Sequence, residues 1–160
     1  MHKEDLTEIL RQHPFLFGLS DEMMHVLIGC ASNVRYAEGE YLIHEGEVAN
    51  NFFMIRTGRV ALEIDVVGKP DLRILTTGPG EVLGWSWLIS PYRWHFNGVA
   101  VVETRAVALD AECLRNKCEG DPLFGYEMLK RLAQVMERRL EATRLQLLDL
   151  YGTSLTEGQR

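Results

Sequence analysis

The sequence has 160 residues, of which 46% are hydrophobic, enough for one domain with a packed core. Acidic residues outnumber basic ones by 23 to 17, giving a net charge of −6. Because a nucleic-acid binder needs a basic face, this balance argues against direct DNA binding. The charged N-terminus, MHKEDLTEILRQH, lacks the apolar core of a signal peptide, and no apolar run approaches the length of a membrane span. We therefore expect a cytoplasmic protein with no membrane partner.

The first part of the chain, residues 1–32, is expected to be helical. Leu6, Ile9 and Leu10 would share one face, and Pro14 would end the first helix. Ser20 is a predicted N-cap, because acidic residues follow it in what would be the first helical turn.

The second part, from Asn33 to about Asp110, consists of short β-type runs separated by glycine-containing turns. The runs read NVRYA, YLIHE, NFFMIRT, RVALEIDVV, LRILTT, GVAVVET and AVALD. Short strands at this spacing predict an antiparallel sandwich or barrel.

The third part is a long helix over residues 121–151, capped by Asp121 and ended by Gly152, with residues 152–160 as a tail. Apolar residues recur along it at alternating steps of four and three, as in a coiled coil. A homodimer through this helix is favoured over a helix that packs only on its own domain. The predicted interface residues are Leu129, Met136, Leu140 and Leu147.

The cysteines are odd in number and show no CxxC spacing. Reduced thiols are therefore the expectation for Cys30, Cys113 and Cys118. A redox pair between Cys113 and Cys118, five residues apart, is the less favoured alternative. The basic pairs Lys130-Arg131 and Arg138-Arg139 are expected on solvated faces of the long helix or in ion pairs between helices.

The stretch GEYLIHEGEVANNFFMIRTGRVAL resembles the entry half of a cyclic-nucleotide-binding domain, with Gly39, Gly46 and Gly58 where that family turns. LTTGPGEVLGW resembles the approach to the family's phosphate-binding cassette, and AVALD its exit strand. The resemblance implies a mainly β fold: a jelly-roll-like antiparallel β-roll with helical flanks over residues 1–120, followed by the long dimer helix. Such a chain would be the sensor half of a catabolite-activator type of bacterial regulator, and not an enzyme.

The resemblance fails inside the cassette. In the family, a Gly-Glu pair opens a short helix whose N–H groups hold the cyclic phosphate, the Glu takes the ribose hydroxyl, and a later Arg pairs with the phosphate. Here Trp85 stands at the Glu position and Phe96 at the Arg position, while Arg93 lies three residues too early. The sequence therefore predicts weak binding of cyclic AMP and cyclic GMP, or none.

All three tryptophans lie in this one stretch, GWSWLISPYRWHFNG, residues 84–98. One interpretation is an altered pocket with aromatic walls, polar anchors that include His95, and an anion site at the start of a Gly84–Ser90 helix. The other is a pocket filled by its own side chains, and the two are evenly weighted. Helical spacing predicts that at least one of Trp85, Trp87 and Leu88 is core. The candidate ligand-binding residues are Gly84, Trp85, Ser86, Arg93, Trp94, Phe96 and Asn97.

Two functions from different classes follow from these interpretations. The first is a stand-alone sensor that binds a non-standard small-molecule or nucleotide effector and signals through its dimer helix. The second is a non-sensing dimeric scaffold for an unidentified protein partner. No catalytic motif stands out, and His44 and His95 lack the spacing of metal ligands. Only GTSLTEGQR follows Tyr151, too short for a helix-turn-helix, so no DNA partner is expected.

Overall fold

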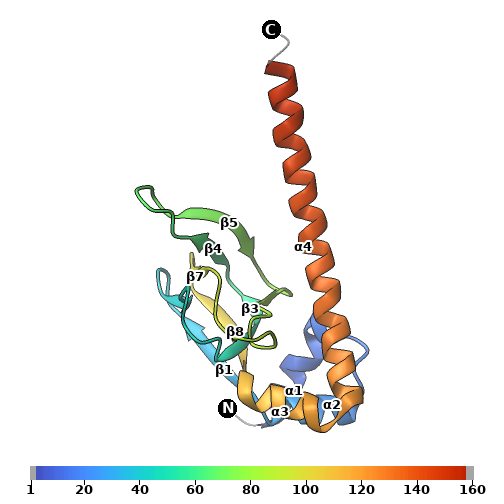
Figure 1. Ribbon diagram of the computed structural model, residues 1–160. Helices are drawn as coiled ribbons and strands as arrows, with labels where there is room; N and C mark the ends of the chain where they lie inside the picture. Colours follow the sequence, from blue (N-terminus) through green and yellow to red (C-terminus); the bar gives the residue numbers. More distant parts are fainter. Residues whose placement is uncertain (1–2, 158–160) are drawn as a thin grey trace.

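The computed structural model describes residues 3–157 and confirms the expected antiparallel β-roll with helical flanks (Figure 1). Three short helical segments precede the roll, and two helices follow it. The elements in chain order are α1 (Lys3–Gln12), η1 (Pro14–Leu16), α2 (Asp21–Ile28), β1 (Ala31–Tyr36), β2 (Tyr41–Ile43), β3 (Asn51–Thr57), β4 (Val60–Ile64), β5 (Leu72–Thr77), β6 (Val82–Leu83), β7 (Asn97–Ala100), β8 (Thr104–Asp110), α3 (Ala111–Gly120) and α4 (Pro122–Glu157).

The roll is built from two four-stranded sheets whose neighbouring strands are all antiparallel. One sheet has the order β1-β8-β3-β6 and the other β2-β7-β4-β5. Strand β3 reads NFFMIRT, and residues 52–55 within it are all buried. This continuous apolar run is expected of a strand covered on both faces, and it places β3 at the centre of the core.

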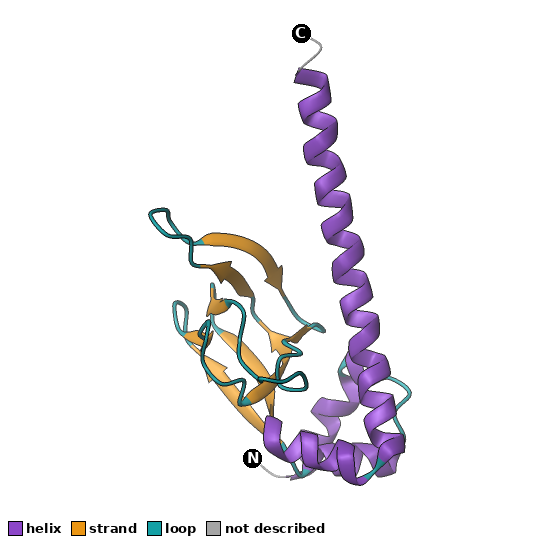
Figure 2. Ribbon diagram, viewed as in Figure 1, coloured by secondary structure: helices purple, strands orange, loops and turns teal. Residues whose placement is uncertain are grey.

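The N-terminal helices close one end of the roll, where Figure 2 shows the purple helices gathered below the orange strands. Leu6 and Leu10 of α1 are buried, as the apolar periodicity predicts. Ser20 caps α2 as expected, since its Oγ accepts a hydrogen bond from Met23 N at 3.2 Å. His13 is also buried: its Nδ1 accepts from Phe15 N at 3.2 Å, and its Nε2 lies 3.1 Å from Ile55 O.

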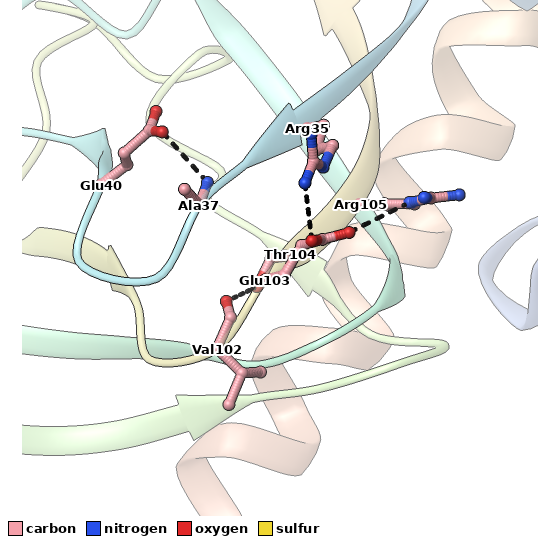
Figure 3. A network of polar contacts seen from close by, with 7 residues as sticks. All are labelled: Arg35, Ala37, Glu40, Val102, Glu103, Thr104 and Arg105. Carbon is pink, nitrogen blue, oxygen red and sulfur yellow. Dashed lines mark hydrogen bonds and ion pairs between the residues drawn. The ribbon is translucent and has the colours of Figure 1, made fainter.

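Gly58 marks a close approach between two turns of the roll. Its φ is +94°, and a Cβ there would lie 2.5 Å from the carbonyl oxygen of Glu103, so no larger residue fits. A polar network fixes the facing turn: Arg35 binds Glu103 at 2.7 Å, and Thr104 Oγ1 donates to Val102 O at 2.9 Å (Figure 3). Of the three glycines behind the family resemblance, Gly58 therefore has a steric basis, whereas Gly39 and Gly46 share with it only a positive φ.

Helix α3 was not anticipated, and it carries the first correction. Cys113 in its first turn forms a disulfide with Cys30, which precedes β1, so the expectation of reduced thiols is wrong for this pair. The pairing of β1 with β8 brings the two cysteines together, although they are 83 residues apart in sequence. Cys118 is a free thiol, and burial raises its pKa to about 11, which leaves it protonated at neutral pH.

Helix α4 begins at Pro122 as expected, with Asp121 Oδ1 accepting from Phe124 N at 3.3 Å. It continues through Gly152 to Glu157, so the predicted end at Gly152 is wrong; residues 158–160 of the expected tail lie outside the described residues. A glycine lowers helix stability without forcing an end. The buried stripe Phe124, Met128, Leu132 and Val135 packs on the domain, and every described side chain from Leu140 onward is exposed.

Candidate functional site: the cassette loop and the joint between the roll and helix α4

Residues 84–96, here called the cassette loop, connect β6 to β7 through a series of turns. The expected Gly84–Ser90 helix is not formed, which corrects the prediction of an anion site at its N-terminus. The local bonds span three residues, as in Leu88 N to Trp85 O at 3.0 Å. The Trp87 carbonyl has no backbone donor four positions on, because that residue is Pro91, which has no N–H group, so no helix can continue through this point.

Arg115 of α3 takes the place of that missing donor. Its Nη1 donates to Trp87 O at 2.6 Å, and its guanidinium lies 4.2 Å from the centre of the Tyr92 ring. One side chain thus satisfies the free carbonyl and stacks on the loop's tyrosine. The cassette loop is thereby attached to the helix that leads into α4.

Trp87 is core, which confirms the expectation from helical spacing. Its side chain is 0% exposed, and its ring lies 5.6 Å from that of Phe52 in β3. Its indole N–H has no hydrogen-bond partner among the described residues, a cost that the burial of the large ring offsets.

Trp94 occupies the space beside Gly84. Gly84 has a φ of +83°, and a Cβ built on it would lie 2.2 Å from Cζ3 of the Trp94 indole. Trp94 is only 5% exposed. The backbone of Trp94 forms two hydrogen bonds with the turn after β2: Gly46 N donates to Trp94 O at 2.8 Å, and Trp94 N donates to Glu47 O at 3.0 Å. The indole and Gly84 are therefore packed against each other without a gap.

The other aromatic and hydroxyl candidates lie around this contact. Phe96 is half-buried, with its ring 6.3 Å from that of Trp94, and Ser86 is buried. Trp85 is half-buried and turns toward α4, where the Arg139 guanidinium lies 5.2 Å from its ring centre. The structure thus brings Trp94, Phe96 and Gly84 together and directs Trp85 to a different partner.

The two polar candidates already have partners within the chain. Arg93 is exposed, and its Nη1 donates to Gly46 O at 2.9 Å on the turn after β2. Asn97 is buried: its Oδ1 accepts from Glu45 N at 2.8 Å, and its Nδ2 donates to Asp65 Oδ1 at 2.9 Å. Both side chains therefore link neighbouring turns of the roll.

Two cavities flank Pro14, and neither is lined by the cassette loop. The larger, here called the roll–helix cavity, has a volume of about 400 Å³. It is lined by residues 14–15 of η1, 75–76 of β5, 80–82 around β6, and Val135, Arg138, Arg139 and Ala142 of α4. The smaller, of about 240 Å³, lies between α1, η1 and the end of β3.

Arg139 crosses from α4 to the roll, where its Nη2 donates to Val82 O. Its Nη1 is buried with no hydrogen-bond partner among the described residues. Burial lowers the pKa of the guanidinium, the nearby Glu81 carboxylate raises it, and Arg138 lowers it. Its usual pKa lies so far above neutrality that the group stays charged. Arg131 likewise donates to Phe15 O at 3.0 Å and Phe17 O at 2.9 Å. The expected solvated faces are therefore wrong for Arg131 and Arg139.

Sequence reasoning missed the joint between the roll and α4 as a site. The pair Arg138-Arg139 was noticed only as surface charge, and Arg115 was not singled out. A usable signal existed in the helical spacing, since Arg139 continues the buried stripe four residues after Val135. Within residues 3–157, no group of three His, Cys, Asp or Glu side chains could hold a metal ion. None of the described helices combines the length and apolar character needed to cross a membrane.

Comparison with known proteins identifies the family. The model of the cyclic nucleotide-binding domain matches residues 33–121, more than half of the chain, so this protein belongs to that family of regulatory domains. The chain is 24% identical over 150 residues, 94% of its length, to a CRP-like cAMP-activated global transcriptional regulator of Mycobacterium tuberculosis. It is 38% identical over 76 residues, 48% of its length, to a cGMP-dependent protein kinase of Toxoplasma gondii, of which it covers 7%.

Solved structures confirm the fold. A cyclic nucleotide-binding domain from Methylobacillus flagellatus superposes with a TM-score of 0.78 at 23% identity, over 91% of this chain and 84% of that one. At this identity the likeness shows the fold alone. The chain spans 65% of the length of the mycobacterial regulator, so that protein's whole activity does not transfer by similarity.

Proposed function

We propose that this protein is a dimeric regulatory module whose cassette is filled by its own aromatic side chains and does not take cyclic AMP or cyclic GMP. The contact between Trp94 and Gly84 carries the proposal. The resemblance places Gly84 where the family's cassette holds the cyclic phosphate. An indole packed against that glycine leaves no room for the phosphate beside it.

The charges of the cassette loop support the same conclusion. A cyclic phosphate carries one negative charge, and burying it requires a cation or several N–H donors. Phe96 stands at the position of the family's arginine, and the guanidinium of Arg93 is engaged with Gly46. The helix whose N–H groups would face the phosphate is replaced by turns. The evenly weighted alternatives of an altered and a filled cassette thus shift toward the filled one.

Calorimetric titration with cyclic AMP and cyclic GMP tests this proposal. The loss of two hydrogen bonds to charged groups, at about 1.5–3 kcal/mol each, weakens binding on the order of a hundredfold or more. We expect no binding in the low-micromolar range and unchanged tryptophan emission. Low-micromolar binding would contradict the filled cassette, and loss of that binding in Arg93→Ala would show that Arg93 replaces the family's arginine.

The dimer is proposed from the exposed apolar stripe of α4. Leu140 and Leu147 are 64% and 49% exposed, and Leu129 and Met136 continue the stripe toward the domain. Such a contiguous apolar face on a projecting helix is typical of an interaction surface. The alternating steps of four and three favour a second copy of the same helix as its partner.

We expect the double variant Leu140→Asp with Leu147→Asp to be a monomer in sedimentation velocity, because each change places a carboxylate in an apolar interface. The matched control is Gln134→Asp with Gln146→Asp, which adds the same charge to exposed positions off the stripe. The control should remain a dimer at micromolar concentration. A wild-type monomer, or two variants that behave alike, would contradict the interface.

A further inference from the structure

We propose that the Cys30–Cys113 disulfide is a reversible redox switch that controls how firmly α3 anchors the cassette loop. The bond joins the residue that precedes β1 to the first turn of α3. Such a bond regulates a protein when its oxidised and reduced states hold a functional element differently. The switch goes beyond the proposed function, which concerns nucleotide binding and the dimer, and it requires neither.

The fold brings the two cysteines together by contacts that do not depend on the covalent bond. Asp110, the last residue of β8, donates its backbone N–H to Cys30 O at 2.9 Å, and its carboxylate accepts from Cys113 N at 2.8 Å as the N-cap of α3. The pairing of β1 with β8 holds the same corner through Ala31 and Leu109. The roll and its strand register are therefore expected to survive reduction, so the reduced chain is a folded state.

The two cysteines differ in exposure, and this assigns the steps of the exchange. Cys30 is 7% exposed, whereas Cys113 is half-buried. The thiolate of a small reductant such as glutathione attacks Sγ of Cys113 and forms a mixed disulfide, while Cys30 leaves with the electron pair of the broken bond and takes up a proton. A second thiolate then attacks the reductant's sulfur in the mixed disulfide. This step releases Cys113, which takes up a proton, and leaves the reductant as its own disulfide. Oxidised glutathione reverses both steps.

The third cysteine, Cys118, is placed so that it does not compete in this exchange. It follows Cys113 by five residues on α3, which at 3.6 residues per turn puts it roughly 140° around the helix. Its side chain faces α4, since a Cβ built on Gly125 would lie 3.3 Å from Cys118 Cβ. Burial raises the pKa of its thiol to about 11, so the nucleophilic thiolate is scarce at neutral pH. The exchange is therefore confined to the Cys30–Cys113 pair.

Reduction reaches the cassette loop through Arg115, which follows Cys113 by two residues in α3. Arg115 Nη1 donates to Trp87 O at 2.6 Å, and its guanidinium lies 4.2 Å from the centre of the Tyr92 ring. Once the covalent link is broken, the first turn of α3 keeps the cap from Asp110 but loses its tie to the segment before β1. Local opening of this turn then costs less free energy, so the contacts of Arg115 are formed for a smaller fraction of the time.

A redox titration of the full chain tests the switch. The folded chain is equilibrated over a range of reduced to oxidised glutathione, and free thiols are then alkylated in denaturant and assigned by mass spectrometry. We expect Cys30 and Cys113 to open and re-form together, with tryptophan emission following the same midpoint, because all three tryptophans lie in the cassette loop. The reduced chain should unfold at a temperature roughly 5–15 °C lower. A disulfide that resists excess reduced glutathione until the chain unfolds, or that opens without a change in emission, would overturn the proposal.

Variants separate the switch from a general loss of stability. The double variant Cys30→Ala with Cys113→Ala should show the emission of the reduced chain in both buffers, whereas Cys118→Ala should keep the wild-type response. Arg115→Gln should retain the thiol titration but lose most of the emission change, and Arg105→Gln, on a surface arginine, should retain both. A redox response in the double variant, or a full emission change in Arg115→Gln, would contradict the mechanism. These readouts involve neither cyclic nucleotides nor the dimer, so they can fail independently of the proposed function.

Discussion

The cassette loop and the joint between the roll and α4 share one side-chain arrangement, but the first is tightly packed and the second contains a cavity. In both, an arginine from a C-terminal helix donates to a backbone carbonyl of the roll and stacks on an aromatic ring. Arg115 reaches Trp87 O and Tyr92 in the cassette loop, and Arg139 reaches Val82 O and Trp85 in the joint. In the cassette loop, the space beside Gly84 is filled by Trp94, whereas Arg139 lines a cavity.

This difference shows which side chains decide whether the region around such an arginine is filled or open. In the cassette loop, two aromatic side chains, Trp87 and Trp94, are buried in the core. At the joint, α4 contributes Val135, Arg138, Arg139 and Ala142 to the cavity lining, and none of these is an aromatic side chain. Side-chain volume, more than charge, thus separates the two regions.

The largest expected effect comes from opening the cassette loop. Trp94→Ala removes a buried indole and should lower the free energy of unfolding by about 3–5 kcal/mol. Trp85→Ala removes a half-buried ring and should cost less than about 3 kcal/mol. Urea unfolding followed by circular dichroism measures both changes. Equal losses in the two variants would show that the cassette loop is no more tightly packed than the joint.

An intermediate effect is expected from the arginine of the cassette loop. Arg115→Gln removes the charged donor to Trp87 O and the contact with Tyr92, and should lower the free energy of unfolding by roughly 1.5–3 kcal/mol. Arg105→Gln is the control, since Arg105 makes a surface ion pair with Glu103 at 3.6 Å, worth about 0–1 kcal/mol. The same urea titration compares them, and a control that loses as much as Arg115→Gln would refute the anchoring role.

The smallest effect concerns pH at the N-terminal end of the roll, where His13 lies between α1 and β3. Burial lowers the pKa of His13 in the folded state, and backbone hydrogen bonds partly oppose this shift. The unfolded chain therefore takes up the proton first, so stability is fully present above the unfolded pKa of about 6.5 and falls as the pH drops below it.

The variant His13→Gln should flatten the pH dependence of thermal unfolding below pH 6.5. The exposed His25→Gln should leave the wild-type slope in place. A slope that persists in His13→Gln would mean that another group causes the acid sensitivity.

The coarse fold was predictable because it depends on local signals that survive without tertiary context. Ser20 caps α2 with its own side chain, Pro122 starts α4, and the glycines at 39, 46 and 58 all have positive φ in tight turns. The replacement of the family's glutamate and arginine by Trp85 and Phe96 was likewise visible in the residue order. These features are set by one residue and its immediate neighbours.

Only the tertiary structure decided where the aromatic and cationic side chains go. Residues 84–90 form turns where a helix was expected, and Arg115, distant in sequence, satisfies the carbonyl of Trp87. Cys30 paired with Cys113 because β1 and β8 are neighbours in a sheet. Arg139 became buried because α4 folds back over β6. Each outcome depends on a contact between segments that are far apart in the sequence and approach one another only in the folded roll. The order of residues along the chain does not show which of these segments will be neighbours.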